Sequence, residues 1–206
     1  MKDKKQILVG EKIGMTQLIL ETGKVQSVTI IRAYENEIVG IRTKEKDGYS
    51  AVRVGYKSCK KEKLNKPDSG QFKAENSYKK IKEFRVEDSS SFELNSKVDL
   101  ATFQVNSKYD LQSRTIGRGF TGAIKAWNHQ RGPMSHGSKN HRLIGSIGQA
   151  TTPGRVKKGK KMHTRYGNEV VTIKGLELLK IDGEFLFFKG AVPGKKNVVY
   201  ITGENS

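Results

Sequence analysis

Histidine and serine side chains are the first candidates for chemistry in this sequence, and all four histidines lie between residues 129 and 163. A hydrolytic site would pair Ser135 or Ser138 with His136 or His141. It would also need a carboxylate to orient the imidazole, and no Asp or Glu occurs from residue 111 to residue 168. The histidine spacing fits neither a helix face nor a zinc signature. These residues therefore favour contacts with bases, ribose or phosphate over catalysis or metal binding.

Two glycine-rich runs resemble nucleotide-binding motifs without completing them. Gly117, Gly119 and Gly122 spell G-x-G-x-x-G, but the preceding residues are polar and basic and no acid follows within about 20 residues. The run 154–161 (GRVKKGKK) resembles a P-loop, but Lys161 stands where Ser or Thr should bind magnesium. No small-molecule substrate is predicted. Glycine and lysine together instead suit contacts with a phosphate backbone.

The stretch 111–168 concentrates the positive charge of the chain. It holds 12 of the 39 Lys and Arg residues, none of the 21 acids, 10 of the 22 glycines and the one Trp, in a protein of net charge +18. Such a segment cannot bury enough apolar surface to offset the entropy of ordering. We expect a polyanion to order it.

The candidate RNA-binding residues of this stretch are its basic side chains, three histidines and the tryptophan. For Trp127, stacking on RNA and anchoring the base of the insertion are both open. The predicted set is Arg114, Arg118, Lys125, Trp127, His129, Arg131, His136, Lys139, His141, Arg142, Arg155, Lys157, Lys158, Lys160, Lys161 and Arg165.

Bulk composition narrows the function classes. The pI near 9.9 points to nucleic acid before an anionic membrane. No apolar run approaches the roughly 20 residues of a membrane span, and no amphipathic helix is predicted, so we expect no membrane partner. Cys59 is the single cysteine, which excludes an internal disulfide and a thiolate zinc cluster. No signal or transit peptide is evident, so we expect action in the compartment of synthesis.

Short β-rich segments flank the basic stretch on both sides. Residues 1–110 and 169–206 predict one β domain, a small barrel or sandwich, with a polar loop and short-helix excursion at 57–98 and the basic stretch 111–168 inserted between strands. Turns are expected at Gly23 and at Asp182-Gly183. The predicted strands are 6–9, 15–20, 25–32, 38–42, 51–56, 81–86, 98–105, 169–173, 176–181, 184–188 and 198–201.

Long blocks of this sequence resemble one family, the bacterial and plastid type of large-subunit ribosomal protein L3. The blocks follow the family order along nearly the full length. They are GEKIGMTQ (10–17), GYSAVRVGY (48–56), IGRGFTGAIK (116–125), GPMSHGSKNHR (132–142), GSIGQATTPGRVKKGKKM (145–162) and KGAVPG (189–194). Two positions depart from the usual pattern: Ala126 replaces Arg and Thr164 replaces Gly, which concerns individual phosphate contacts and one local turn.

The resemblance implies a translation-protein-type β-barrel with a basic extension that enters ribosomal RNA towards the peptidyl-transferase centre. It implies direct binding of large-subunit rRNA, early action in subunit assembly, and contacts with neighbouring ribosomal proteins. Gln149 matches a glutamine that a methyltransferase N5-methylates in many bacteria, and we add it to the predicted RNA-binding set. The tip 147–152 is nearly uncharged, which suits packing among bases.

Our main hypothesis is a structural RNA-binding protein of the large ribosomal subunit that is not an enzyme. The alternative is an RNA-processing or RNA-modifying enzyme that holds its substrate with the basic loop; such an enzyme would need a general base or metal-binding carboxylates near the RNA. No cofactor is expected beyond structural magnesium bound with the RNA. The expected location is the ribosome in a bacterial cytoplasm, with a plastid (chloroplast) ribosome as the alternative.

Overall fold

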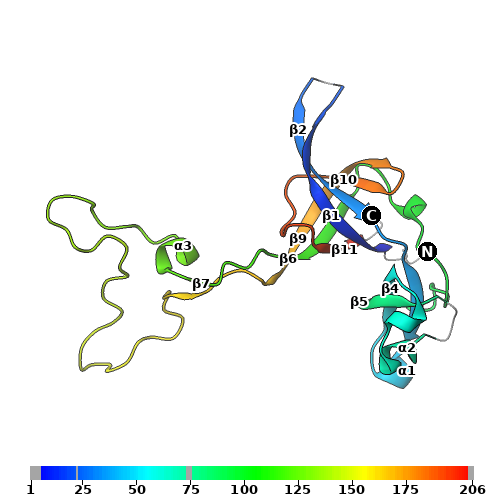
Figure 1. Cartoon of the computed structure of the whole chain (residues 1–206), viewed down its shortest axis with the longest axis horizontal. Coiled ribbons are helices and arrows are strands. Elements are labelled where there is room, and N and C mark those ends of the chain that lie inside the picture. Colours follow the sequence, from blue (N-terminus) through cyan, green and yellow to red (C-terminus); the bar gives the residue numbers. More distant parts are fainter. Residues whose placement is uncertain (1–5, 22, 73–75, 204–206) are drawn as a thin grey trace. The chain divides into compact units, whose positions relative to one another are not determined.

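The chain folds into two compact units, which are shown in Figure 1. The structure is a computed structural model, and it describes residues 6–21, 23–72 and 76–203. Unit 1 comprises residues 1–114 and 170–206, and unit 2 comprises residues 115–169. The basic stretch therefore lies almost wholly in unit 2.

Six strands of unit 1 close into a ring in which each strand pairs with two antiparallel neighbours. The order around the ring is β1-β11-β6-β9-β10-β2, so strands from both sides of the insertion contribute to it. This is the mainly β domain that the sequence predicted. The strands are β1 (Gln6–Ile19), β2 (Val25–Ala33), β6 (Lys108–Arg114), β9 (Val170–Asp182), β10 (Phe185–Lys189) and β11 (Val198–Gly203).

Unit 1 also contains a separate three-stranded antiparallel sheet in the order β3-β4-β5. Its strands are β3 (Glu37–Arg42), β4 (Ala51–Ser58) and β5 (Tyr78–Arg85). The sequence predicted these strands but assigned no second sheet to them. Short helical turns accompany the sheets, namely α1 (Lys44–Asp47), η1 (Lys61–Lys63), α2 (Lys66–Ser69) and η2 (Leu100–Thr102).

Two apolar cores hold unit 1 together, and β1 contributes to both. Leu8 packs with Ile31, Leu111 and Phe188 in the core made by the ring strands. The flanking Ile7 and Val9 point to the opposite face, where they join Val52, Val54 and Phe84 of the three-stranded sheet. A strand buried on both faces needs a continuous apolar run, and this explains why the sequence reads Ile-Leu-Val there.

The two predicted turns lie where left-handed glycines are needed. Gly23 has φ 77°, and its N–H donates to the Leu20 carbonyl at 2.8 Å. Gly183 has φ 57° and joins β9 to β10. Glycine adopts this conformation without steric cost, so the prediction from Asp-Gly is confirmed. Thr22 of the first predicted turn lies outside the described residues.

The structure corrects the sequence prediction around residues 98–114. Residues 98–105 form no strand; they contain the single 3-10 turn η2. The ring strand is instead β6, to which we had assigned no strand and whose residues 111–114 we had placed in the basic stretch. Its alternate residues Tyr109, Leu111 and Ser113 are buried. The ring needs only these three inward side chains, so a strand with four polar outward residues fits.

The polar excursion at 57–98 also differs in detail from the prediction. Its strand is β5, which begins three residues before the predicted 81–86. Its short α-helix is α2, which ends at Ser69. Residues 73–75 lie outside the described part of the chain.

Unit 2 has little regular structure. Its elements are β7 (Phe120–Thr121), which pairs with β8 (Thr164–Arg165), and the helix α3 (Ala123–Trp127). Within the ranges described, no helix of either unit is long and apolar enough to cross a membrane.

Candidate nucleic-acid interface

The two arms of unit 2 are joined at their base by backbone hydrogen bonds. The Thr115 N–H donates to the Glu169 carbonyl at 2.8 Å, and the Arg118 N–H donates to the Tyr166 carbonyl at 2.8 Å. The Tyr166 N–H returns a bond to the Gly119 carbonyl at 3.0 Å. These bonds extend the β7–β8 pair and satisfy backbone groups that would otherwise be left to water.

Glycines allow the arms to approach this closely. A Cβ on Gly167 would lie 2.1 Å from the Ile116 carbonyl oxygen, and Gly167 also has φ 77°. Gly119, the middle glycine of the G-x-G-x-x-G run, has φ 65°. A Cβ at Gly119 would meet no atom within 4 Å, so of these two glycines it is Gly167 that admits the opposite arm. That the glycines of the G-x-G-x-x-G run admit a phosphate chain stays a prediction.

Trp127 connects α3 to the returning arm. Its indole Nε1 donates to the Met162 carbonyl at 2.7 Å, and the Lys161 Nζ lies 5.8 Å from the centre of its ring. The side chain nevertheless remains 41% exposed. Of the two roles left open by the sequence, this contact supports anchoring of the insertion, while stacking on RNA stays a prediction.

Further aromatic residues, which the sequence analysis did not select, bridge the arms. The ring of Phe120 stacks on His163 with centroids 6.4 Å apart, and the guanidinium of Arg118 lies 5.6 Å from the centre of the Tyr166 ring. Phe120 is 75% exposed and Tyr166 is 40% exposed. A signal in the sequence could have identified both residues: each is an aromatic residue next to a glycine in a positively charged segment. Such aromatic residues suit stacking on bases.

Residues 131–142 form a loop closed on itself. The Gly132 N–H donates to the His141 carbonyl at 2.9 Å, and the His141 Nδ1 lies 2.9 Å from the Pro133 carbonyl oxygen. A Cβ at Gly132 would lie 1.8 Å from the Asn140 carbonyl oxygen. His136 adopts φ 59°, a conformation that is uncommon for residues other than glycine. The loop thus has a defined path, and the hydrogen bonds that stabilise it join residues of the loop itself.

The tip of unit 2 is a turn around Gln149. The Ser146 hydroxyl donates to the Gly148 carbonyl at 2.9 Å, and the Gly154 N–H donates to the Ala150 carbonyl at 3.3 Å. These contacts bring residues 145–156 around an open hollow. Gln149 is exposed, and its side-chain amide makes none of the hydrogen bonds found among the described residues.

Unit 2 has almost no apolar interior. Ala123 is the only residue of 115–169 among the buried hydrophobic residues of the described chain. Both apolar cores are built from unit 1 alone. Large apolar side chains such as Leu143 (69% exposed) and Met134 (51%) face solvent instead. Burial of apolar surface therefore contributes little to the order of this unit.

The basic side chains of unit 2 are exposed and lack carboxylate partners. Eleven of the twelve predicted basic residues lie between Arg118 and Arg165, and none of these eleven forms an ion pair within the described ranges. All eleven are exposed. The twelfth, Arg114, is the last residue of β6 in unit 1. Uncompensated like charges repel each other, so the unit is suited to a polyanion.

Most predicted site residues share the unit but do not contact each other. The structure brings Trp127 against Lys161, and Arg118 against Tyr166. It places the four lysines 157, 158, 160 and 161 on one turn, where the Lys160 N–H donates to the Lys157 carbonyl at 3.3 Å. The role of each predicted residue in RNA binding stays a prediction.

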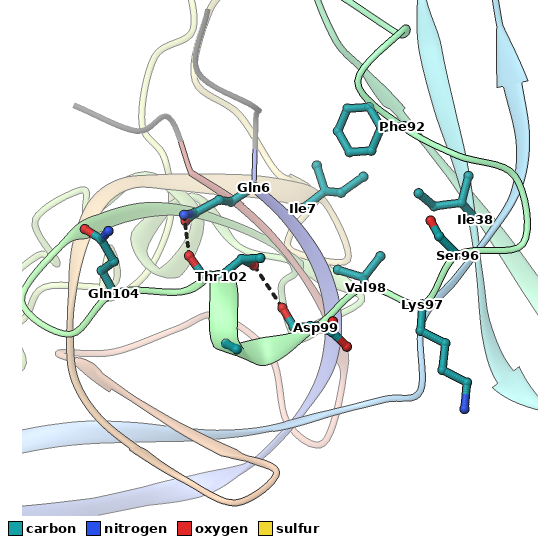
Figure 2. A pocket seen from close by; sticks show the side chains of 11 residues that line it. Gln6, Ile7, Ile38, Phe92, Ser96, Lys97, Val98, Asp99, Thr102 and Gln104 are labelled. Atoms are coloured by element: carbon teal, nitrogen blue, oxygen red, sulfur yellow. Dashed lines mark hydrogen bonds between the residues drawn. The ribbon is translucent and has the colours of Figure 1, made fainter. Parts of the chain in front are cut away.

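Unit 1 contains a cavity of about 460 Å³, which Figure 2 shows. One side is apolar, with Ile7, Ile38 and Phe92, and the other carries Gln6 and Thr102. The Gln6 side chain donates to the Thr102 carbonyl at 2.5 Å, as the dashed line marks. Neither histidine nor cysteine is among the side chains that line it.

Titratable groups with shifted pKa values in unit 1 have structural partners. The Tyr49 hydroxyl donates to Glu83 at 2.6 Å and Arg42 pairs with Glu83 at 3.1 Å, which together hold the pKa of the Glu83 carboxyl below its usual range. Burial lowers the pKa of Lys12, whose Nζ donates to the carbonyls of Val192 and Gly194. Across the described ranges, no group of three or more His, Cys, Asp or Glu residues could hold a metal ion.

Comparison with known proteins identifies the family. The family model described as ribosomal protein L3 matches residues 82–184. The chain is 44% identical over 192 residues to the large ribosomal subunit protein uL3 of Prochlorococcus marinus (strain MIT 9312), covering 91% of this chain and 88% of the relative. It is 44% identical over 192 residues to the uL3c protein of Cyanophora paradoxa, covering 91% and 92%, and 41% identical to that of Phaeodactylum tricornutum, covering 91% and 93%.

The family model matches half of the chain, and the relatives cover about nine tenths of it at 41% to 44% identity. Together they confirm the resemblance drawn from the sequence blocks. The rival reading as an RNA-modifying enzyme finds no support in them. The chain belongs to the ribosomal protein L3 family and is a structural, non-enzymatic protein of the large ribosomal subunit.

Proposed function

We propose that the protein binds large-subunit ribosomal RNA directly, and that unit 2 is the principal contact. The observation that carries this proposal is the combination of eleven exposed basic side chains without ion pairs, within the described ranges, and a unit without an apolar core. RNA phosphates would supply the missing counter-charges. Release of the counterions condensed on the RNA would then contribute to the binding free energy.

The arms and the tip of unit 2 have different roles in this proposal. The basic side chains of the arms contact phosphates, which position the protein without reading sequence. The exposed rings of Phe120, Trp127 and Tyr166 are available to stack on unpaired bases. The uncharged tip around Gln149 packs among bases near the peptidyl-transferase centre. Binding by such a unit orders protein and RNA together, which supports a role early in subunit assembly.

Gln149 is the proposed site of N5-methylation by a glutamine methyltransferase. Its amide is exposed and makes no hydrogen bond with the described part of the chain, so an enzyme could reach it in the free protein. Mass spectrometry of the protein from its own ribosomes checks this: a mass increase of one methyl group on the peptide containing Gln149 is the expected result.

The finer points of fold and location belong to the same proposal. The closed ring with its inserted unit is of the translation-protein barrel type, and neighbouring ribosomal proteins cover other parts of its surface. The protein itself needs no cofactor, and structural magnesium accompanies the RNA. Its ribosome lies in a bacterial cytoplasm, or alternatively in a plastid; its relatives include both cyanobacterial and plastid proteins.

Charge reversal in unit 2 tests the proposal. Changing Lys157, Lys158, Lys160 and Lys161 together to Glu should block incorporation into the large subunit, as judged by sedimentation. A matched control reverses four exposed lysines of unit 1, at positions 24, 44, 46 and 97, and should incorporate far better. Normal incorporation of the unit 2 variant would count heavily against the proposal.

Limited trypsin digestion with and without large-subunit rRNA provides a second test. Twelve tryptic sites lie from Arg114 to Arg165. We expect cleavage at these sites in the free protein and protection when RNA is bound. Resistance without RNA would show that unit 2 is stable on its own, which the lack of an apolar core argues against.

A further inference from the structure

A second concentration of positive charge lies in unit 1, outside the basic stretch. The end of β4 and the segment after it, residues 57–66, carry five lysines, and the start of β5, residues 77–82, carries three more. Glu62 is the only acid in the two segments. We call this set the lysine patch, and its members are Lys57, Lys60, Lys61, Lys63, Lys66, Lys79, Lys80 and Lys82.

Strand pairing brings the two segments together. β4 and β5 are antiparallel neighbours, as Figure 1 shows, with Tyr56 opposite Lys80 and Ser58 opposite Tyr78. Beyond the strands, the Cys59 N–H donates to the Ser77 carbonyl at 2.9 Å and continues the pairing. Lysines that are about 20 residues apart in the sequence therefore share one end of the sheet. In the sequence these lysines are spread over the excursion 57–98, which we had interpreted as a polar loop with a short helix.

The patch is not neutralised by the protein. Six of its lysines are exposed, and none of the eight forms an ion pair with a described carboxylate. Elsewhere in the same sheet, Arg42 is paired with both Asp47 and Glu83. Because basic residues of this sheet can be paired, the unpaired cluster marks a surface suited to an external anion.

Tyrosine rings hold the two partly buried lysines in place. The Lys57 Nζ lies 5.1 Å from the centre of the Tyr34 ring, and the Lys82 Nζ lies 4.5 Å from the centre of the Tyr200 ring. Tyr56 lies between these rings, with centroids 6.0 Å and 6.3 Å away, and its hydroxyl is 3.1 Å from that of Tyr200. Cation–π contacts of this kind fix an ammonium group without neutralising it.

Backbone strain at Lys57 adds an independent observation. Its φ is 61°, in the left-handed region that Asn, Asp and Gly tolerate and lysine rarely adopts. Of the six other non-glycine residues with positive φ among those described, four are asparagines, at positions 95, 106, 128 and 168, and the remaining two are His136 and Lys196. A lysine in this conformation is less stable than asparagine or glycine would be there, and such strain is typical of functional positions.

We infer that the lysine patch is a second RNA-binding surface, which contacts the phosphate backbone of large-subunit rRNA independently of unit 2. This inference rests on the proposed RNA-binding function. Lysines are compact, hydrated point charges on flexible stems, which suit phosphates. Protein interfaces are depleted in lysine and have an apolar centre, whereas no large apolar side chain of 57–66 or 77–82 is among the exposed ones. An acidic protein is therefore the weaker candidate.

The test compares two triple variants of the full-length protein. The patch variant changes Lys60, Lys79 and Lys80 to Gln; all three are exposed and take no part in either core. The control variant changes Lys24, Lys44 and Lys46 to Gln, which removes the same charge from exposed positions of unit 1 outside the patch. Filter binding to in vitro transcribed bacterial large-subunit rRNA is measured over a range of salt concentrations.

The patch variant should bind RNA about tenfold more weakly than the wild type at physiological salt, and the salt slope should fall by about 2 to 3, because each lost phosphate contact removes about 0.7 to 0.9. The control variant should change affinity by less than about threefold, with a slope close to that of the wild type. Equal effects of the two variants would overturn the inference, since net charge alone would then explain them.

A single substitution separates RNA contact from folding. Lys57→Asn removes the charge but keeps a residue that tolerates the left-handed backbone. We expect weaker RNA binding, by about two- to threefold, together with a midpoint of thermal unfolding that is unchanged or higher. Wild-type affinity in Lys57→Asn combined with wild-type affinity in the patch variant would overturn the inference.

The remaining outcomes distinguish the inference from the proposed function. If the unit 2 lysine reversal abolishes binding while the patch variant binds like its control, the proposed function stands and the patch inference fails. If the patch variant binds naked RNA normally but is lost from assembled subunits, the partner is a protein and the inference also fails. Failure of the wild type to bind rRNA would reject both.

Discussion

Unit 1 and unit 2 of the same chain reach an ordered structure by different routes. Unit 1 buries two apolar cores and pairs its charges: all five ion pairs found among the described residues lie in it. Unit 2 buries one alanine among its apolar residues and pairs none of its basic residues from Arg118 to Arg165 within the described ranges. Apolar burial stabilises unit 1. Within the described ranges, unit 2 is held only by hydrogen bonds and ring contacts among its own residues.

The free energy of the RNA complex should therefore have a different source in each unit. A preordered β unit loses little conformational entropy on binding. A unit without a core has that entropy still to lose, and its counter-charges come from the partner. The lysine patch combines both properties, because it places unpaired charges on a preordered sheet.

The largest expected effect is the loss of a buried aromatic side chain in unit 1. Phe188 is fully buried, so Phe188→Ala should lower the free energy of unfolding by about 3 to 5 kcal/mol. The control is Leu143→Ala in unit 2, where the side chain is 69% exposed and the change should be within about 0.5 kcal/mol. Denaturant titration measures both. A comparable cost for Leu143→Ala would show that unit 2 has a core after all.

A smaller effect is expected at a buried polar group of unit 1. Glu37 is 4% exposed and accepts hydrogen bonds from the Tyr78 hydroxyl and, at 2.9 Å, from the Asn76 side chain. Tyr78→Phe should destabilise the protein by about 2 kcal/mol, because a buried carboxylate loses a donor. Phe72, which packs on Tyr78, offers a matched control as Phe72→Leu, which leaves Glu37 untouched.

The same tyrosine gives a pH dependence. Burial and its hydrogen bond to Glu37 raise the pKa of Tyr78 above its usual value near 10. Above about pH 10 the unfolded chain releases the phenolic proton while the folded protein retains it, so the free energy of unfolding falls as pH rises. In Tyr78→Phe, part of this fall in the free energy of unfolding should disappear. A pH profile identical to that of the wild type would contradict the assignment of the fall to Tyr78.

Replacing unit 2 should stabilise unit 1 slightly. Residues 118–165 can be exchanged for an eight-residue Gly-Ser linker, because the arms meet where the Arg118 N–H bonds the Tyr166 carbonyl at 2.8 Å. The shorter loop should raise the free energy of unfolding by about 1.5 kcal/mol, from loop-closure entropy. Calorimetry should show one cooperative transition. Loss of cooperativity would mean that the insertion is part of the fold of unit 1.

The smallest effect on stability, and the most local one, is expected for Trp127→Phe. An aromatic ring remains on the side of Lys161, while the hydrogen bond from Nε1 to the Met162 carbonyl is lost. Unfolding of unit 1 should change by less than about 0.5 kcal/mol. Trypsin should cut unit 2 a few times faster because its arms are less firmly joined. An unchanged cutting rate would show that Trp127 does not anchor the arms.

Much of unit 1 could be predicted because its strands carry local signals. β2, β4 and β10 were recognised from β-branched and aromatic residues, and the turns at Gly23 and Gly183 from glycine after polar residues. β6 was missed because its sequence KYDLQSR is mostly polar, and only the ring around it makes Tyr109 and Leu111 inward-facing. Residues 98–105 look like a strand, but Phe103 reaches the core from a loop.

The candidate RNA-binding residues were predictable as a set, because charge and the absence of acids are properties of composition. Contacts between distant residues were not: nothing in the sequence joins Trp127 to Met162, or Phe120 to His163. The lysine patch was also invisible, since only the β4–β5 pairing, with Tyr56 opposite Lys80 and Ser58 opposite Tyr78, brings its two segments to one end of the sheet.

From residue types and spacing alone we could predict a β unit built from both sides of the chain and an acid-free insertion with uncompensated charge. Both conclusions rest on residue type and spacing, which act locally or through composition. Which strands close the ring, which form the second sheet, and which basic residues lie near each other became clear only from the folded chain. These depend on pairing between residues far apart in the chain, where many registers satisfy the same local pattern and packing of the two cores selects one.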